Sequence, residues 1–356
     1  MKKLYKDIRF TKGILTLTAG LLIAGCSAED ELGNNSSAQQ LNMIPMVNDL
    51  QKSRANDEDA LHEKTLSKLD FKMFEPESGK CCVNHQSSSP AENQAEVLGK
   101  NNWKVDLNLQ EDHSYNYYAV ANAQADLSKK TLEELQAATQ QDNDIWQPYP
   151  QAKDKKFLMS AKGQYIISKD PIQDIPVELV RAAAKIKLNL SSSVNGYNIT
   201  NVKWKFLNYN TNTSVFAGQT ATPNIMSNNA DNMVDKIEAN KCSVTTYSYS
   251  TTWTSQEDAP KIAVKVVFQS KDNKNDTREK ELTIPVRDPK GEKKLERNYI
   301  YTVNADIKRL KDDINIDYDE ELGYLKWAIT KWTTGEDTEV DADKASYLVV
   351  YPTTLD

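Results

Sequence analysis

Histidine is scarce in this sequence of 356 residues, which contains only His62, His85 and His113. No two of them have the HExxH spacing of a zinc protease, so a metal site of that type is excluded. The chain also lacks GxSxG, GxGxxG, and GxxxxGK followed by Ser or Thr, which removes the commonest hydrolase and nucleotide-binding signatures. We therefore expect no catalytic activity, no cofactor and no metal ion.

Basic residues are fewer than acidic ones, with 44 Lys and Arg against 51 Asp and Glu and a net charge of −7. A protein that coats nucleic acid needs a basic face to displace counterions, so we expect no nucleic-acid partner. The composition, 39% hydrophobic and 27% charged, is ordinary for a soluble globular chain. The length is about that of two domains.

Cysteines are also few, with Cys81, Cys82 and Cys242 in addition to Cys26. Neighbouring cysteines do not bond to each other without strain, and an odd number in an exported protein leaves at least one thiol free or paired between chains. The run from Cys81 to His85 could be half of a metal site, but the other half is absent. We predict a solvated loop there, and no disulfide framework.

The apolar run nearest the amino terminus, Ile14–Ile23, is only ten residues long and cannot span about 30 Å of hydrocarbon as a helix. Four lysines and Arg9 precede it, against one aspartate, which is the pattern of a secretory signal. Cys26 follows Ile-Ala-Gly directly and makes it a lipoprotein signal. Signal peptidase II would cut between Gly25 and Cys26, and the lipidated Cys26 would anchor the protein in the outer membrane.

Residues 27–40 have almost no apolar content, so residues 26–40 are predicted to be a flexible tether. Its acidic start, Ser-Ala-Glu-Asp-Glu, is similar to the surface-export signal of Bacteroidales lipoproteins. Without residues 1–25, which carry a charge of +4, the net charge is −7 minus +4, or −11.

Period-2 alternation of apolar and polar residues dominates the remaining chain and predicts an all-β protein. The alternating runs are 41–47, 69–73, 103–109, 115–121, 157–159, 165–167, 182–190, 202–206, 262–268, 282–284, 299–307, 325–329 and 347–351. A capping box formed by Thr131 and Glu134 predicts one short helix. Clean alternation means one buried and one wet face, as in antiparallel sheets, and it places Arg181 and Lys185 on a wet face.

The simplest architecture is two antiparallel β-sandwiches with a minor helix. Pro171 and Pro176 suggest a break in the chain, so the first domain is predicted at 41–175 and the second at 176–356. Residues 75–100 are predicted to be a loop. The acidic run 312–319 lacks the glycine and final glutamate of an EF-hand loop, so we predict a strand with a wet face there rather than a calcium site.

Several runs together resemble the fimbrillins, subunits of the type V pili of Bacteroidales. Residues 176–186, PVELVRAAAKI, are similar to the leader strand of the second fimbrillin domain. Three other segments also resemble fimbrillin segments, and all four occur in the order found in that family. They are residues 115–122, which end in Ala-Val-Ala-Asn, residues 157–160 and residues 297–303. The lipoprotein signal and an arginine-containing loop complete the resemblance, which covers essentially the whole chain.

The resemblance implies two transthyretin-like sandwiches and a fimbrial subunit matured by a trypsin-like protease. Cleavage would follow Arg54, with Lys52 as a second choice, and would remove the strand 41–47 as part of residues 41–54. The emptied groove would accept the carboxy-terminal strand of a neighbouring subunit. Its central residues here would be Tyr347, Leu348, Val349, Val350 and Tyr351. The partners would then be other fimbrial subunits, with ligands on host or bacterial surfaces.

Three alternatives remain open at this point. The terminal strand 347–351 could be the last strand of its own sandwich. The chain could be an anchor or tip subunit that is not cut or does not donate a strand. It could also be a surface lipoprotein that binds glycans, because six tryptophans could stack on sugar rings. Alternation assigns Trp103, Trp204 and Trp327 to a core but leaves Trp146, Trp253 and Trp332 unassigned.

Overall fold

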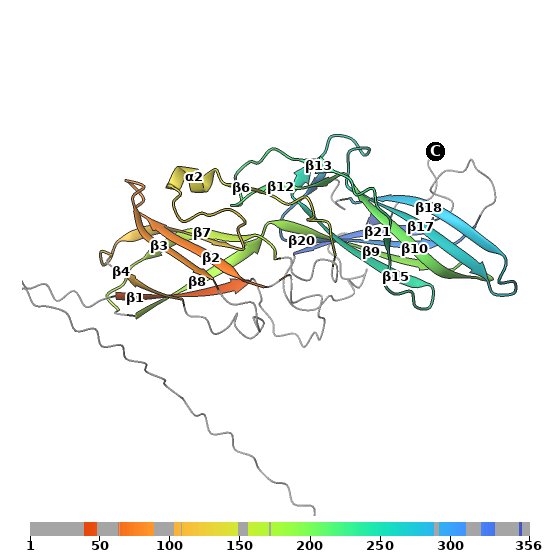
Figure 1. Cartoon of the computed structure of the whole chain (residues 1–356), viewed down its shortest axis with the longest axis horizontal. Helices are drawn as coiled ribbons and strands as arrows, with labels where there is room; N and C mark the ends of the chain where they lie inside the picture. The colour runs from red at the N-terminus through yellow and green to blue at the C-terminus, as the bar shows by residue number, and fades with distance from the viewer. Residues whose placement is uncertain are drawn as a thin grey trace, which may run out of the picture. The chain divides into compact units, whose positions relative to one another are not determined.

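The computed structural model describes residues 39–47, 63, 65–88, 103–107, 109–148, 156–170, 172–287, 292–310, 322–331 and 349–350. Almost all regular structure in these ranges is β-strand, which confirms the predicted fold class (Figure 1). The strands of the amino-terminal half are β1 (Gln39–Val47), β2 (Lys68–Phe74), β3 (Cys81–Ser88), β4 (Trp103–Leu107), β5 (Ser114–Ala121), β6 (Thr139–Gln141), β7 (Met159–Ile166) and β8 (Ile172–Arg181).

The remaining strands follow Arg181. They are β9 (Ala183–Ser192), β10 (Tyr197–Leu207), β11 (Tyr209–Asn210), β12 (Asn212–Ser214), β13 (Ile225–Met226), β14 (Asn232–Met233), β15 (Lys241–Tyr249), β16 (Thr251–Thr252), β17 (Lys261–Ser270), β18 (Thr277–Pro285), β19 (Lys294–Leu295), β20 (Tyr299–Ile307), β21 (Leu322–Lys331) and β22 (Val349–Val350). The helix α2 (Leu132–Gln136) has the expected capping box between Thr131 and Glu134.

Apart from β6, the strands of the first half form one sheet in the order β3-β2-β5-β7-β8-β1-β4. Most strands after Arg181 form a sheet of order β14-β10-β17-β18 and another of order β13-β11-β15-β9-β20-β21-β22, while β16 and β19 form a small sheet of their own. Most pairs are antiparallel, as expected, but β1–β8 and β9–β20 are parallel. Each of β1 and β9 therefore lies between one parallel and one antiparallel neighbour, β4 in the first case and β15 in the second.

Strand β8 runs through the position at which the sequence suggested a domain boundary. Pro176 is paired with Ile44 in the middle of this strand, and residues up to Arg181 pair with β1 or β7. The first sheet therefore continues as far as Arg181, and the change of sheet comes at Ala182. The division into two separate domains stays a prediction.

Two further expectations differ from the structure. Residues 75–100 were expected to be a loop, but Cys81–Ser88 form the edge strand β3, whose pairing with β2 depends on the backbone rather than on an apolar pattern. The two short strands expected around 157–167 are one strand, β7. Gly163 makes this continuity feasible, because a Cβ there would come within 2.8 Å of the Tyr117 ring on β5.

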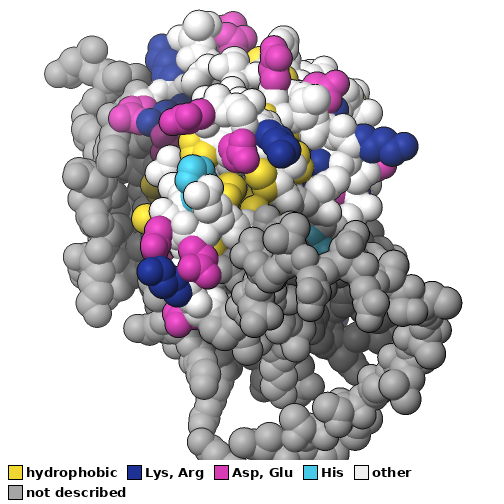
Figure 2. All heavy atoms as spheres, turned by 90° about the vertical axis from the view of Figure 1, so that its left-hand side faces the viewer, with side chains coloured by type: hydrophobic (Ala, Val, Ile, Leu, Met, Phe, Trp, Pro, Cys, Tyr) yellow, Lys and Arg dark blue, Asp and Glu magenta, His cyan; other side chains and the backbone are white. Residues whose placement is uncertain are grey.

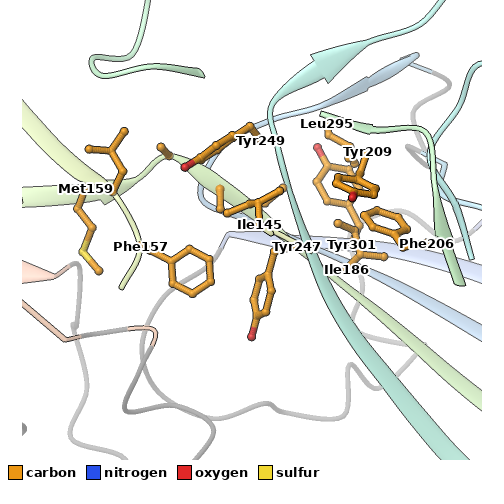
Figure 3. Close-up of a cluster of buried hydrophobic side chains, with 14 of the residues drawn as sticks. Ile145, Phe157, Met159, Ile186, Phe206, Tyr209, Tyr247, Tyr249, Leu295 and Tyr301 are labelled. Atoms are coloured by element: carbon orange, nitrogen blue, oxygen red, sulfur yellow. The ribbon is translucent and has the colours of Figure 1, made fainter. Parts of the chain in front are cut away.

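Apolar side chains from both halves of the chain share one buried cluster (Figure 3). The Phe157 ring lies 4.8 Å from that of Tyr247 on β15. Trp146 stacks edge-on against Trp204 of β10 at 6.1 Å, and its carbonyl oxygen accepts a hydrogen bond from the Thr246 hydroxyl. Strand β6 of the first half pairs with β12 of the second. The segment around residues 139–147 therefore packs into the core of the second half.

Candidate functional site

Strand β1 occupies an interior position in the first sheet, between β8 and β4. Its residues form eight parallel register pairs with β8, from Gln40–Ile172 to Val47–Leu179. The antiparallel pairing with β4 covers only Gln39 to Met43. Beyond Met43, β1 therefore has β8 as its single recorded neighbour among the described strands.

Within the described residues, β8 depends on β1 for nearly all of its pairing. Its other neighbour, β7, pairs only with Val180 and Arg181 at its far end. Loss of β1 would leave the ladder edge of residues 172–179 open. An unpaired row of backbone N–H and C=O groups is the kind of edge that another strand can pair with.

If β1 were removed, the side chains of β8 would line one border of an apolar groove. Ile175, Val177 and Leu179 point inward and are each at most 1% exposed, whereas Asp174 and Glu178 are exposed. The alternation is the one that a half-buried strand requires. A strand that replaced β1 would therefore gain backbone pairing at a border that β8 lines with apolar side chains.

Two prolines reduce the number of backbone hydrogen-bond donors in the paired strands β1 and β8. Pro45 of β1 and Pro176 of β8 lie one register position apart, and neither can donate a backbone hydrogen bond. Parallel pairing is also slightly less stable per residue than antiparallel pairing. Pro45 lies beyond the stretch paired with β4, where it costs no second ladder bond. Strand β1 therefore combines an interior place with a parallel ladder that contains two prolines.

Asn122 holds the chain at residues 65–67, which follow the segment that contains Arg54. The sequence analysis did not predict this role. Its side-chain oxygen accepts a hydrogen bond from the backbone of Ser67 at 2.9 Å. Its amide nitrogen donates to the carbonyl oxygens of Thr65 and Phe157, at 2.8 and 2.9 Å. Its φ of 60° is in the left-handed region that asparagine tolerates. The signal was present in the sequence as an asparagine directly after an alternating run.

Most of the residues predicted as sites lie outside the described part of the chain. This applies to Gly25, Cys26, Arg54, and, at the carboxy terminus, Tyr347, Leu348 and Tyr351. Val349 and Val350 form β22, which pairs with Trp327 and Lys326 at the edge of its own sheet. The predicted donor segment thus has a short pairing within its own chain.

The three cysteines in the described ranges, Cys81, Cys82 and Cys242, are free thiols. Burial raises the pKa of Cys242 to about 11, and that of Cys81 above the usual thiol range. Burial and the nearby Glu75 carboxylate do the same for Cys82. These thiols are poor nucleophiles at neutral pH, because the thiolate is the reactive form. No group of three or more metal-ligating side chains occurs in the ranges that the structure describes.

Acidic and basic side chains are interspersed around a small hydrophobic area on the face shown in Figure 2. The described part of this face is not uniformly basic. No helix in the described ranges is long and apolar enough to cross a membrane.

The chain matches no family model and no curated protein. It does match solved structures over almost their full length. A fimbrilin of Porphyromonas gingivalis has a TM-score of 0.57 at 13% identity, with 84% of this chain and 99% of that one covered. A candidate cell adhesion protein of Parabacteroides distasonis has a TM-score of 0.56 at 15% identity, with coverages of 83% and 97%.

The tip fimbrial protein Mfa3 of Porphyromonas gingivalis, with a carboxy-terminal truncation, has a TM-score of 0.51 at 15% identity. It covers 83% of this chain, and 99% of its own length is matched. Structural similarity at such low identity establishes architecture and leaves the role of individual residues open. The chain has the fold of these fimbrial and cell adhesion proteins.

Proposed function

We propose that this chain is a non-catalytic structural subunit of a cell-surface fimbria that supports adhesion. It is exported as a lipoprotein, cut after Arg54 and assembled by strand exchange with neighbouring subunits. The observation that carries the proposal is the placement of β1, which fills an interior sheet position next to β8 through a parallel ladder that contains two prolines. The fold shared with fimbrial proteins supports the same function.

The connection of β1 to the rest of the chain, rather than its pairing, accounts for why this strand, and not its counterpart in the second half, would be the removable one. Strand β9 has the same kind of neighbours as β1, but Ala182 alone separates it from β8. Strand β1 is joined to β2 by a long segment, 48–67, which contains Lys52 and Arg54. One cut there would separate β1 from the rest of the chain without breaking any other strand that the structure describes.

Amino-terminal sequencing of the protein taken from the cell surface tests this proposal. We expect the polymerised form to begin at Ala55, because the lipidated segment and β1 leave together. The unassembled precursor should instead have a blocked amino terminus at Cys26. A polymer whose subunits retain residues 41–47 would contradict strand removal and would favour an anchor subunit that is not cut.

Lipidation of Cys26 has its own test. Each buried CH₂ group contributes about 0.8 kcal/mol, so two or three acyl chains bind a membrane far more firmly than one. We expect a clickable palmitate analogue to label the uncut precursor, and Cys26→Ala to abolish the labelling and release the precursor from membranes. Ser27→Ala is the matched control. Label that persists in Cys26→Ala would rule out this cysteine as the lipid attachment site.

The glycan-binding alternative loses support at one tryptophan. Trp253 is 8% exposed, and a ring that stacks on a sugar needs a free face. Trp146 packs edge-on against Trp204 but is only partly buried, so it stays open as a position for sugar stacking. Deletion of residues 346–356 would distinguish a tip subunit from a subunit that donates its carboxy-terminal strand.

A further inference from the structure

Glu63 is a buried glutamate in the segment between Arg54 and β2. It is 4% exposed, and eight residues separate it from Arg54. Its carboxylate lies 2.9 Å from the Lys185 ammonium and accepts a hydrogen bond of 2.7 Å from the Tyr247 hydroxyl. Burying a carboxylate is costly unless it is paired and hydrogen-bonded, and both conditions are met here.

The partners of Glu63 come from strands far away in the sequence. Lys185 is on β9 and Tyr247 on β15, where its ring also contacts Phe157 (Figure 3). Arg181, the last residue of β8, donates from Nε to the Glu63 carbonyl oxygen at 2.8 Å. Both the backbone and the side chain of Glu63 are therefore bound to the part of the chain that follows β7.

A second attachment lies immediately downstream. Asn122 holds the Thr65 carbonyl and the Ser67 backbone, as described above, and Leu66 is 6% exposed. The peptide bond between Lys64 and Thr65 thus lies between two fixed positions, Glu63 and Thr65. A protease that cuts after lysine could reach this bond only after the contacts on at least one side had opened.

The segment upstream of Glu63 contains no further basic residue. Residues 55–62 are Ala-Asn-Asp-Glu-Asp-Ala-Leu-His, so the next site for a trypsin-like protease after Arg54 is Lys64. The Arg54–Ala55 bond lies outside the described residues, whereas the residues on both sides of Lys64 are described. The Lys64–Thr65 bond is flanked by a buried ion pair and by hydrogen-bonded backbone.

We propose that Glu63 sets the limit of proteolytic maturation. Its contacts hold the chain in place, so the protease cuts after Arg54 and not after Lys64. The new amino-terminal segment then stays attached to the body of the subunit. This inference rests on the proposed maturation by a trypsin-like protease. It adds a residue that decides where trimming stops, and it gives the buried Lys185 and Tyr247 the role of holding that residue.

Limited trypsin digestion of the folded full-length chain, followed by intact-mass measurement, tests the inference. In the natural sequence we expect fragments that begin at Ala55 or Ser53, and no early fragment that begins at Thr65. Glu63→Gln removes the charge, and Tyr247→Phe removes one hydrogen bond. We expect cleavage after Lys64 to be at least about tenfold faster in Glu63→Gln and to rise by a smaller factor in Tyr247→Phe. Glu238→Gln, at an exposed ion pair, is the matched control and should cut like the natural chain.

Removing the Glu63 carboxylate breaks its ion pair with the buried Lys185 ammonium, which destabilises the folded chain. The double variant Glu63→Ala, Lys185→Met removes both charges and separates the two effects. Selective cleavage after Lys64 in the folded double variant supports the inference. Resistance of that bond in the folded double variant, or rapid cutting there in the natural chain, overturns it. Surface protein that starts at a residue other than Ala55 would instead refute the proposed maturation and leave this digestion result intact.

Discussion

A chain in which Lys52 and Arg54 are both replaced by alanine is expected to fold, reach the cell surface and remain unpolymerised. Without Lys52 and Arg54, the one basic residue left between β1 and β2 is Lys64. Its neighbours Glu63 and Thr65 are held by an ion pair and hydrogen bonds, so a trypsin-like protease should not cut there and β1 stays in place. We expect at least about 100-fold less polymer, because a pocket built around a buried charge strongly rejects a side chain that lacks its complement. The measurement is the ratio of polymer to monomer in surface extracts.

The control must remove the same kind of charge elsewhere. Lys271 and Lys274 lie exposed in the turn between β17 and β18, so their double replacement by alanine should leave polymerisation unchanged. A rescue experiment makes the prediction sharper. Replacing residues 52–54 by the recognition sequence of an unrelated protease should give a chain that polymerises only when that protease is added. Normal polymerisation of the Lys52, Arg54 double variant would show that β1 is not removed by this route.

The all-β architecture could be predicted from the sequence because period-2 alternation is a local property. Runs such as 202–206, 262–268 and 299–307 became β10, β17 and β20 in the expected places. Thr131 and Glu134 fixed the helix start for the same reason, since a capping box needs only four residues. Where the residues of one element carry the signal, sequence reasoning succeeded.

Edge strands and buried charges could not be predicted in this way. Strand β3 is held by backbone pairing to β2, and its sequence, Cys-Cys-Val-Asn-His-Gln-Ser-Ser, has no apolar face to reveal it. Arg181 and Lys185 were placed on a wet face, which is wrong, because they are 0% and 6% exposed. Their burial depends on Glu63, more than a hundred positions earlier in the chain, and alternation contains no information about such a partner.

The candidate site could likewise be predicted from the sequence only in part. The strand at 41–47 was expected, and the structure has β1 at Gln39–Val47. Its parallel pairing with β8, in a ladder that contains two prolines, was not expected. The roles of Arg54 and of the carboxy-terminal strand stay predictions, since both depend on events outside a single chain.

Deleting residues 346–356 is expected to leave the folded monomer almost unchanged and to abolish incorporation of the next subunit. If Tyr347, Val349 and Tyr351 packed into their own sandwich, each would contribute about 1.5–3 kcal/mol to folding. Losing all three would lower the melting temperature by about ten degrees or more. If these side chains are buried only in a neighbour, the monomer loses little more than the two-residue pairing of β22 with β21. At about 0.5–1.5 kcal/mol for each hydrogen bond, that loss should lower the melting temperature by only a few degrees.

Thermal unfolding of the truncated monomer and an assembly assay, run on the same preparation, distinguish these cases. Deletion of residues 353–356 alone is the control, because it spares the strand and should change neither measurement. A synthetic peptide of residues 346–352 should block assembly of the natural chain by occupying the groove beside β8. A truncated chain that melts ten degrees lower would place the strand in its own sandwich. One that keeps its melting temperature and still adds the next subunit would show that the terminal strand is not the donor, as expected for a tip subunit.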